Sequence, residues 1–168
     1  MSYATRAATA DDTAAIARIY NEGIEDRVGT FETEARSADD VLGWIEAGYP
    51  LVVAEDGAGE LGAWASAPPY RAHRPAYAGV ADFSIYVGRS ARGQGLGKAT
   101  LAALIDEAQG RGYWKLVSRV FPENEASLRL CRSLGFREVG TYRRHAKLDG
   151  IWRDVVIVEI LLGQAVGD

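Results

Sequence analysis

The amino-acid sequence predicts one α+β domain over residues 1–168, with a twisted mixed sheet of six to seven strands and about four flanking helices. Three observations carry this prediction. A chain of 168 residues that is 48% hydrophobic buries about 70% of its unfolded surface around one core. Apolar residues recur at helical spacing in some segments and follow strand patterns in others. Hairpin turns alternate with strand-helix-strand units, so antiparallel and parallel strands are both expected.

The N-terminal half is expected to form one strand, then two helices and then three strands. Thr9 and Ser37 each stand three residues before an aspartate and just ahead of apolar residues at helical spacing, a pattern typical of helix starts. Residues 51–55 and 60–67 form a predicted hairpin, because Asp56-Gly57-Ala58-Gly59 between them favours a turn. Residues 77–87 form the next extended segment, and the prolines of the 68–76 loop separate it from the hairpin.

The C-terminal half is expected to alternate helices and strands. Residues 95–111 repeat apolar side chains on one helical face and end at Gly112, which favours a helix. Residues 115–121 follow as a strand and residues 123–134 as a short helix closed by Gly135. Residues 137–162 then form two strands that turn at Asp149-Gly150.

Composition excludes several classes of function. A formal charge of −4 and a pI near 5.3 give no general attraction for nucleic acid. The N-terminus has no basic segment followed by an apolar run, and no stretch of about 18 apolar residues occurs, so we expect a cytoplasmic protein without a membrane partner. One cysteine and two histidines are too few for a structural metal cluster, so no metal site is predicted.

A glycine-rich segment, residues 85–98, runs from a strand into a helix and favours an anion such as a pyrophosphate. Glycines let the backbone approach a phosphate, and the first N–H groups of a helix lack intrahelical partners. The alternative is a tight corner with no ligand. The segment lacks the Gly-Lys-Ser/Thr ending of a nucleoside triphosphate site and the downstream acid of a dinucleotide site.

This segment resembles the pyrophosphate loop of the GCN5-related N-acetyltransferase (GNAT) superfamily, whose pattern is met by Arg92, Gly95 and Gly97. A second motif of that superfamily, an Asn before a helix ending in Gly-Phe, is similar to residues 124–136. Residues 20–24, 30–32 and 147–155 resemble the phosphinothricin, methionine sulfoximine and arsinothricin N-acetyltransferases within it. The resemblance covers essentially the whole chain.

The resemblance implies an acetyl-CoA-dependent N-acetyltransferase that acetylates the α-amine of a small glutamate-like amino acid or inhibitor, conferring resistance to it, by direct transfer in a ternary complex. It also implies a homodimer. The expected contacts to acetyl-CoA are Ile85, Tyr86, Val87, Arg92, Gly93, Gln94, Gly95, Leu96, Gly97, Lys98, Asn124 and Ser127. Asn124 is equally suited to cap a helix.

Asp82 is the expected general base, because it occupies the place where phosphinothricin-type enzymes carry a glutamate. An α-ammonium has to lose a proton before it can attack a thioester. Aspartate is one methylene shorter, which favours a water relay. The alternative role is an aspartate that accepts backbone N–H bonds at a strand bend.

The expected acceptor-binding residues surround that strand. Arginine forks suit carboxylate, phosphinate and arsinate oxygens, although a solvated basic loop is the alternative interpretation of residues 70–75. The full set of candidates is Phe31, Glu32, Arg71, His73, Arg74, Tyr77, Lys147 and Trp152.

Two features leave other functions open. Cys131 stands where the superfamily often has a tyrosine acid, and its apolar neighbours at helical spacing favour a buried side chain. Without that acid and with a shorter base, a CoA-binding module without catalysis remains an alternative. An N-acetyltransferase for a polyamine or a protein N-terminus is another, although polyamine sites usually need acidic linings and the 70–75 loop is basic.

Overall fold

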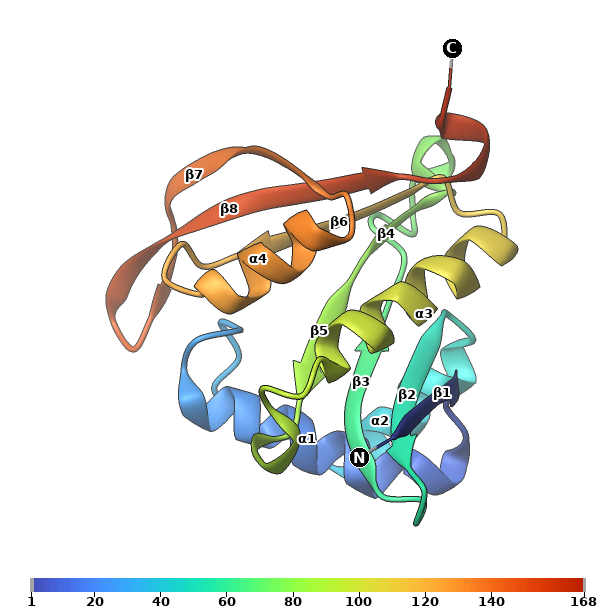
Figure 1. The fold of residues 1–168 in the computed structure, drawn as a ribbon. Coiled ribbons are helices and arrows are strands. Elements are labelled where there is room, and N and C mark those ends of the chain that lie inside the picture. Colours follow the sequence, from blue (N-terminus) through green and yellow to red (C-terminus); the bar gives the residue numbers. More distant parts are fainter. Residues whose placement is uncertain (1, 168) are drawn as a thin grey trace.

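The computed structural model describes residues 2–167 and has a mixed α/β architecture (Figure 1). The mixed α/β prediction and its four α-helices are confirmed in this part of the chain. The helices are α1 (Thr13–Asp26), α2 (Ala38–Ala47), α3 (Leu96–Gly110) and α4 (Glu125–Ser133). The strands are β1 (Tyr3–Ala7), β2 (Leu51–Asp56), β3 (Leu61–Ser66), β4 (Val80–Asp82), β5 (Ser84–Val87), β6 (Lys115–Val120), β7 (Arg137–Leu148) and β8 (Ile151–Leu161).

The strands form two four-stranded sheets, ordered β1-β2-β3-β5 and β4-β6-β8-β7, where a single sheet of six to seven strands was expected. The prediction of one extended segment over residues 77–87 was wrong, and its division explains the difference. Tyr77 ends a short 3-10 helix that begins at Pro75. The next residues form β4, which pairs in parallel with β6, and after Phe83 the chain continues as β5, which pairs antiparallel with β3. Phe83 is 3% exposed, so burial of this residue in the core accompanies the change of partner strand.

Helices cover both faces of the first sheet. The helix α3 packs on β2 and β3 from one side, and α1 with α2 packs on the other (Figure 1). Trp64 of β3 lies in the core under α1, and Leu101 and Leu104 of α3 are fully buried. Both faces of the first sheet are therefore shielded from solvent, which explains why β3 is buried along its whole length.

The helix α4 covers the second sheet and lies near α3 (Figure 1). Leu128 and Cys131 of α4 are buried with Val158 of β8 in the same core cluster as Leu101. This arrangement places the beginnings of α3 and α4 on the same side of the molecule, next to the point where β4 and β5 separate.

Both predicted helix-start signals mark real starts. Ser37 accepts a hydrogen bond from the Asp40 N–H and donates its own N–H to the Asp40 carboxylate, at 3.2 and 2.8 Å. Thr9 begins a 3-10 turn (Ala10–Asp12) that leads into α1. No helix within residues 2–167 has both the length and the apolar character that crossing a bilayer requires.

A charged cluster joins β1 to that 3-10 turn. The buried carboxylate of Asp12 accepts two hydrogen bonds from the guanidinium of Arg6, at 2.8 and 2.9 Å, and Arg6 also binds Glu55 at 2.9 Å. The Arg6 hydrogen bond holds the pKa of the Asp12 carboxyl below its ordinary value. A carboxyl with a lowered pKa in the folded state stabilises the fold above its unfolded pKa of about 3.9 and loses that contribution as the pH falls through the folded pKa.

We expect Asp12→Asn to lower the free energy of unfolding at pH 7 by about 1.5–3 kcal/mol, the usual worth of hydrogen bonds to a charged group. The variant should also lose less stability than the parent between pH 5 and pH 2, about the range in which a paired carboxylate is protonated. Urea unfolding at several pH values measures both effects. Asp11→Asn, at the exposed neighbouring position, is the control, and an equal loss there would contradict the assignment.

Candidate functional site

A cleft of about 910 Å³ opens between the two sheets. It begins where β4 and β5 separate, because the second sheet continues with β6 while the first continues with β3. The walls come from β5, the end of β6, the beginnings of α3 and α4, and the 28–32 segment that follows α1. The cleft therefore collects residues from four distant parts of the sequence.

The main-chain groups of Ile85 and Val87 face this cleft. Gly88 donates its N–H to Gly62 beside β3 at 2.8 Å, whereas Phe83 donates its N–H to Val117 of β6 at 3.0 Å. Main-chain groups of successive strand residues point to opposite sides, so Ile85 and Val87 share the direction of Phe83, away from β3. The sheets have already separated there, and this edge of β5 has no partner strand among residues 2–167.

The side chain of Tyr86 lies in an aromatic cluster beneath the cleft. Its ring stacks on Trp64 with centroids 5.0 Å apart and meets Tyr20 of α1 edge-on at 4.9 Å. Burial raises the pKa of the Tyr86 hydroxyl far above its ordinary value. Tyr86 therefore remains protonated and fixes the position of β5 against α1.

The glycine-rich loop bends around the beginning of α3. Gly93 and Gly95 both have φ of +77°, a backbone conformation that residues other than glycine adopt only at a cost in free energy. Gly95 is the N-cap of α3, and the first helix-type bond after it is donated by Ala99. The N–H groups of the first helical turn therefore have no intrahelical partner, which is the arrangement that binds anions.

Gly97 allows three elements to meet at this place. A Cβ atom there would lie 3.3 Å from Leu130 Cδ2 of α4 and 3.5 Å from Val87 Cγ2 of β5. The absence of a side chain thus keeps the mouth of α3 close to the open edge of β5.

Arg92 fastens the loop to the end of α1. Its guanidinium donates to the Asp26 carboxylate at 2.7 Å and to the Val87 carbonyl at 3.3 Å, and Arg89 binds the same carboxylate at 2.8 Å. Hydrogen bonds from Arg89 and Arg92 hold the pKa of Asp26 below its ordinary value. Lys98 lines the cleft and has no ion pair within residues 2–167, so its ammonium contributes an uncompensated positive charge.

Of the twelve residues expected to bind acetyl-CoA, eleven line the cleft and Gln94 does not. Gln94 is exposed and its amide donates to the Ser90 carbonyl at 3.4 Å. The eleven are Ile85, Tyr86, Val87, Arg92, Gly93, Gly95, Leu96, Gly97, Lys98, Asn124 and Ser127.

Asn124 joins α4 to the segment that follows α1. Its side-chain oxygen accepts the Ser127 N–H at 3.3 Å, so Asn124 caps α4 as expected. Its side-chain NH₂ group donates to the Val28 carbonyl at 3.2 Å. This second bond could not be predicted from the sequence, because Val28 is distant in the chain.

We expect Asn124→Ala to lower the free energy of unfolding by about 1 kcal/mol through loss of the cap. Asn124→Asp should keep near-parental stability because aspartate is an equally good cap. Both variants lose the donor to Val28, so amide exchange in residues 28–32 should rise in both. Hydrogen exchange followed by mass spectrometry measures this, and slow exchange in Asn124→Asp would refute the proposed tether.

Asp82 lies at the end of β4 and lines the cleft. Burial raises the pKa of its carboxyl, and the guanidinium of Arg119 on β6, 3.2 Å away, acts in the opposite direction. The alternative role, in which Asp82 accepts backbone N–H bonds, has no such bond in the described chain. A partly desolvated carboxylate in a cleft is suited to proton transfer.

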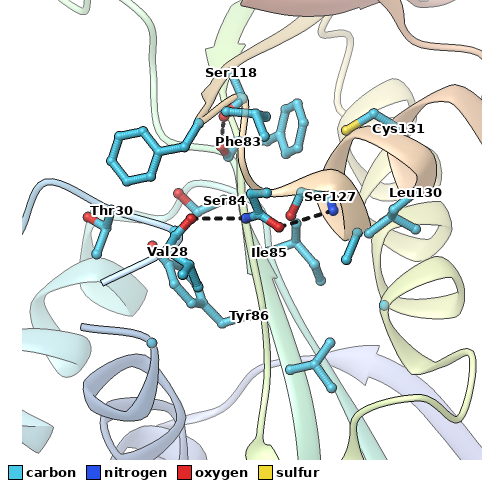
Figure 2. Close-up of a pocket in the computed structure, with 18 of the residues that line it drawn as sticks. Val28, Thr30, Phe83, Ser84, Ile85, Tyr86, Ser118, Ser127, Leu130 and Cys131 are labelled. Carbon is cyan, nitrogen blue, oxygen red and sulfur yellow. Dashed lines mark hydrogen bonds between the residues drawn. The ribbon is translucent and has the colours of Figure 1, made fainter. Parts of the chain in front are cut away.

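The 28–32 segment forms the wall opposite α4, and both candidates in it line the cleft. Phe31 meets Phe121 edge-on with centroids 4.9 Å apart, and Glu32 binds Arg36 at 2.8 Å. Figure 2 shows Val28 and Thr30 on this side of the cleft and Leu130 and Cys131 on the other. The segment therefore forms the side of the cleft that faces α4.

The remaining acceptor candidates do not line the cleft. In the 70–77 loop, the Arg71 guanidinium lies over the rings of Tyr70 and Tyr77 at 5.2 and 5.7 Å. Lys147 and Trp152 face each other on β7 and β8, with Nζ 4.7 Å from the ring. The other two residues of the loop set, His73 and Arg74, are exposed.

Cys131 is 2% exposed, and burial raises the pKa of its thiol to about 11. The expectation of a buried apolar residue therefore fits its environment. A thiol that stays protonated near neutral pH is a poor nucleophile.

The polar residues of the cleft that were not among the candidates include Arg119, Ser118 and Tyr20. Ser118 donates its hydroxyl to the Phe83 carbonyl at 2.9 Å, where the sheets separate (Figure 2). Arg119 follows it on β6. The pairing of β6 with β4 brings both residues to the site, and strand pairing between distant segments carries no local signal.

Comparisons with known proteins agree with this geometry. Residues 15–136 match the acetyltransferase (GNAT) family. The chain is 32% identical to the phosphinothricin N-acetyltransferase of Streptomyces coelicolor, covering 89% of this chain and 90% of the relative. It is 31% identical to the L-methionine sulfoximine/L-methionine sulfone acetyltransferase of Pseudomonas paraeruginosa, over 96% of each.

The fold agrees with a solved structure as well. The GNAT superfamily phosphinothricin acetyltransferase of Sinorhizobium meliloti in complex with AcCoA superimposes with a TM-score of 0.91 at 30% identity. The alignment covers 99% of this chain and 91% of that one.

Proposed function

We propose that this chain, which belongs to the acetyltransferase (GNAT) family, acetylates the α-amino group of a small glutamate-like amino acid or inhibitor. It is an N-acetyltransferase that uses acetyl-CoA. Phosphinothricin, methionine sulfoximine and arsinothricin are the proposed acceptors, and resistance to such compounds is the proposed role. The names of the relatives support the first two.

The residues present fit the donor. The unpartnered N–H groups at the start of α3 suit a diphosphate, and Gly93 and Gly95 leave no side chain in its way. The free edge of β5 at Ile85 and Val87 suits the amides of an extended pantetheine arm. When bound, acetyl-CoA supplies the acetyl group as a thioester.

The observation that carries the proposal is the position of Asp82 in the same cleft as the open edge of β5. The Asp82 carboxylate, directly or through water, accepts a proton from the acceptor's ammonium. The amine nitrogen then attacks the thioester carbon and the carbon–sulfur bond breaks. Of the three ammonium protons, one stays on the amide, one goes to the CoA thiol and one goes to solvent. Holding both reactants in one cleft supplies much of the rate enhancement.

An amine panel assayed by release of the CoA thiol tests the proposal. We expect turnover with phosphinothricin, methionine sulfoximine or arsinothricin, a mass gain of one acetyl group on the acceptor, and none with spermidine. Turnover with spermidine or a protein N-terminal peptide alone would refute the acceptor class. Binding of acetyl-CoA without turnover of any amine would favour a non-catalytic module.

We also propose that the protein is a homodimer. The long strand β7 is an exposed sheet edge, and its side chains Val139 and Tyr142 are 44% and 54% exposed. Exposed apolar side chains along an edge strand favour association. Light scattering after size exclusion should give twice the chain's mass of 18.1 kDa, and a monomer at all concentrations would refute this proposal.

A further inference from the structure

Asp82 and Arg119 form an ion pair between the two parallel strands that border the cleft. Asp82 of β4 is the register partner of Val117 of β6. Arg119 is two residues beyond Val117 and therefore lies on the same face as Asp82. One guanidinium nitrogen, Nη2, donates to the carboxylate oxygen Oδ1 at 3.2 Å.

This contact leaves most of the guanidinium unused. An arginine side chain has five N–H donors, and within residues 2–167 Arg119 has no other hydrogen bond or ion pair. Its side chain is 40% exposed, compared with 26% for Asp82, and both line the cleft. The free edge of Arg119 is therefore accessible to a ligand in the cleft.

The other cationic side chains that line the cleft lie on other elements. Arg92 and Lys98 belong to the glycine-rich loop and the start of α3, and Arg129 belongs to α4. Among the described lining residues, Arg119 is the cation that contacts the proposed base. The basic loop at residues 71–74 does not line the cleft, so it supplies no alternative there.

We propose that Arg119 is a positioning and specificity-determining residue, whose free guanidinium edge binds the α-carboxylate of the acceptor while the adjacent Asp82 faces the acceptor's α-amine. This inference rests on the proposed function. An α-amino acid carries its ammonium and its carboxylate on neighbouring carbons, and the Asp82–Arg119 pair presents the opposite charges side by side. A guanidinium fork binds both oxygens of a carboxylate at once.

The pair thus selects amines that carry a neighbouring anion. Arginine side chains do not exchange protons with substrates in proteins, so Arg119 acts through orientation alone. It holds Asp82 with one nitrogen and aligns the acceptor with the others. A polyamine has no carboxylate for this guanidinium to bind, and its own ammonium groups would be repelled by the guanidinium's positive charge.

The test compares two acceptors, L-methionine sulfone and the same compound with its carboxylate converted to a carboxamide. We expect the parent enzyme to favour the carboxylate, and Arg119→Gln to lower kcat/KM for it about 10- to 100-fold, mainly through KM. The carboxamide should lose much less, because any effect of the substitution on Asp82 is common to both acceptors. Arg119→Lys should recover part of the preference, since it keeps the charge without the fork.

Arg137→Gln is the matched control, because Arg137 lies on β7 outside the cleft and pairs with Glu159. It should leave both acceptors unchanged, and the affinity of Arg119→Gln for acetyl-CoA should equal that of the parent. Equal turnover of the two acceptors by the parent, or an equal loss with both in Arg119→Gln, would overturn the role of Arg119 while acetyl transfer stands. Absence of thiol release by the parent enzyme with both acceptors would refute the proposed function itself.

Discussion

Replacing Asp82 with alanine should lower kcat/KM for the amine by about 10²- to 10⁴-fold near neutral pH, the usual contribution of a positioned general base. The acceptor arrives as an ammonium, and the variant has no carboxylate in the cleft to take its proton. The loss should shrink as the pH rises toward the pKa of the acceptor amine, because the free amine then becomes abundant in solution. Initial rates of thiol release between pH 6 and pH 10 measure both effects, over about the range in which an amine deprotonates.

Two further substitutions of Asp82 distinguish the loss of a proton acceptor from a change in the local structure. Asp82→Asn keeps the size and the contact to Arg119 but cannot accept a proton, so it should be as slow as alanine. Asp82→Glu restores a carboxylate and should retain most of the activity. The affinity for acetyl-CoA should stay close to that of the parent in all three, because Asp82 ends β4, whereas the proposed donor contacts belong to β5, the glycine-rich loop and the beginnings of α3 and α4. A rate for Asp82→Asn equal to that of the parent would exclude Asp82 as the base.

Replacing Gly95 with valine should weaken acetyl-CoA binding by about 10- to 100-fold. Gly95 caps α3 with φ of +77°, and valine relieves the strain of that conformation by moving the loop. Binding then has to restore the strained loop or lose N–H bonds to the diphosphate. Titration calorimetry with acetyl-CoA measures the loss, and kcat at saturating donor should fall less than the affinity.

Gly59→Val is the control for strain alone. Gly59 has φ of +85° in the turn between β2 and β3, away from the cleft. This variant should lose stability to thermal unfolding and bind acetyl-CoA as the parent does. If both variants bind equally well, the glycine-rich loop does not hold the donor.

Local patterns predicted most elements of the fold. Ser37 and Asp40 mark the start of α2, and Asp149-Gly150 marks the turn between β7 and β8. The division into β4 and β5 was missed, because residues on both sides of Phe83 are equally suited to strands. Partners from distant segments decide where one strand ends, and a local pattern contains no information on them.

In the candidate site as well, residues in local motifs were predicted and residues from distant segments were not. The donor half follows two local motifs, in residues 85–98 and 124–136, and eleven of its twelve expected residues line the cleft. The proposed acceptor half comes from separate segments, so Arg119 was not among the candidates and the 70–75 loop was favoured for its charge. That loop packs on itself, with Arg71 against Tyr70. Charge near a site in sequence is a weak guide, because only chain pairing decides which charges enter the cleft.

The unpaired edge of β5 has a thermodynamic consequence. With the donor bound as proposed, the pantetheine amides bind main-chain groups of β5 that have no partner strand within residues 2–167, so the ligand adds to the stability of the sheet. Mass action then couples metabolite level to folding: at one hundred times its dissociation constant, such a ligand adds about 2.7 kcal/mol to the stability of the folded state. The abundance of the enzyme in a cell would accordingly follow the supply of the molecule that it consumes.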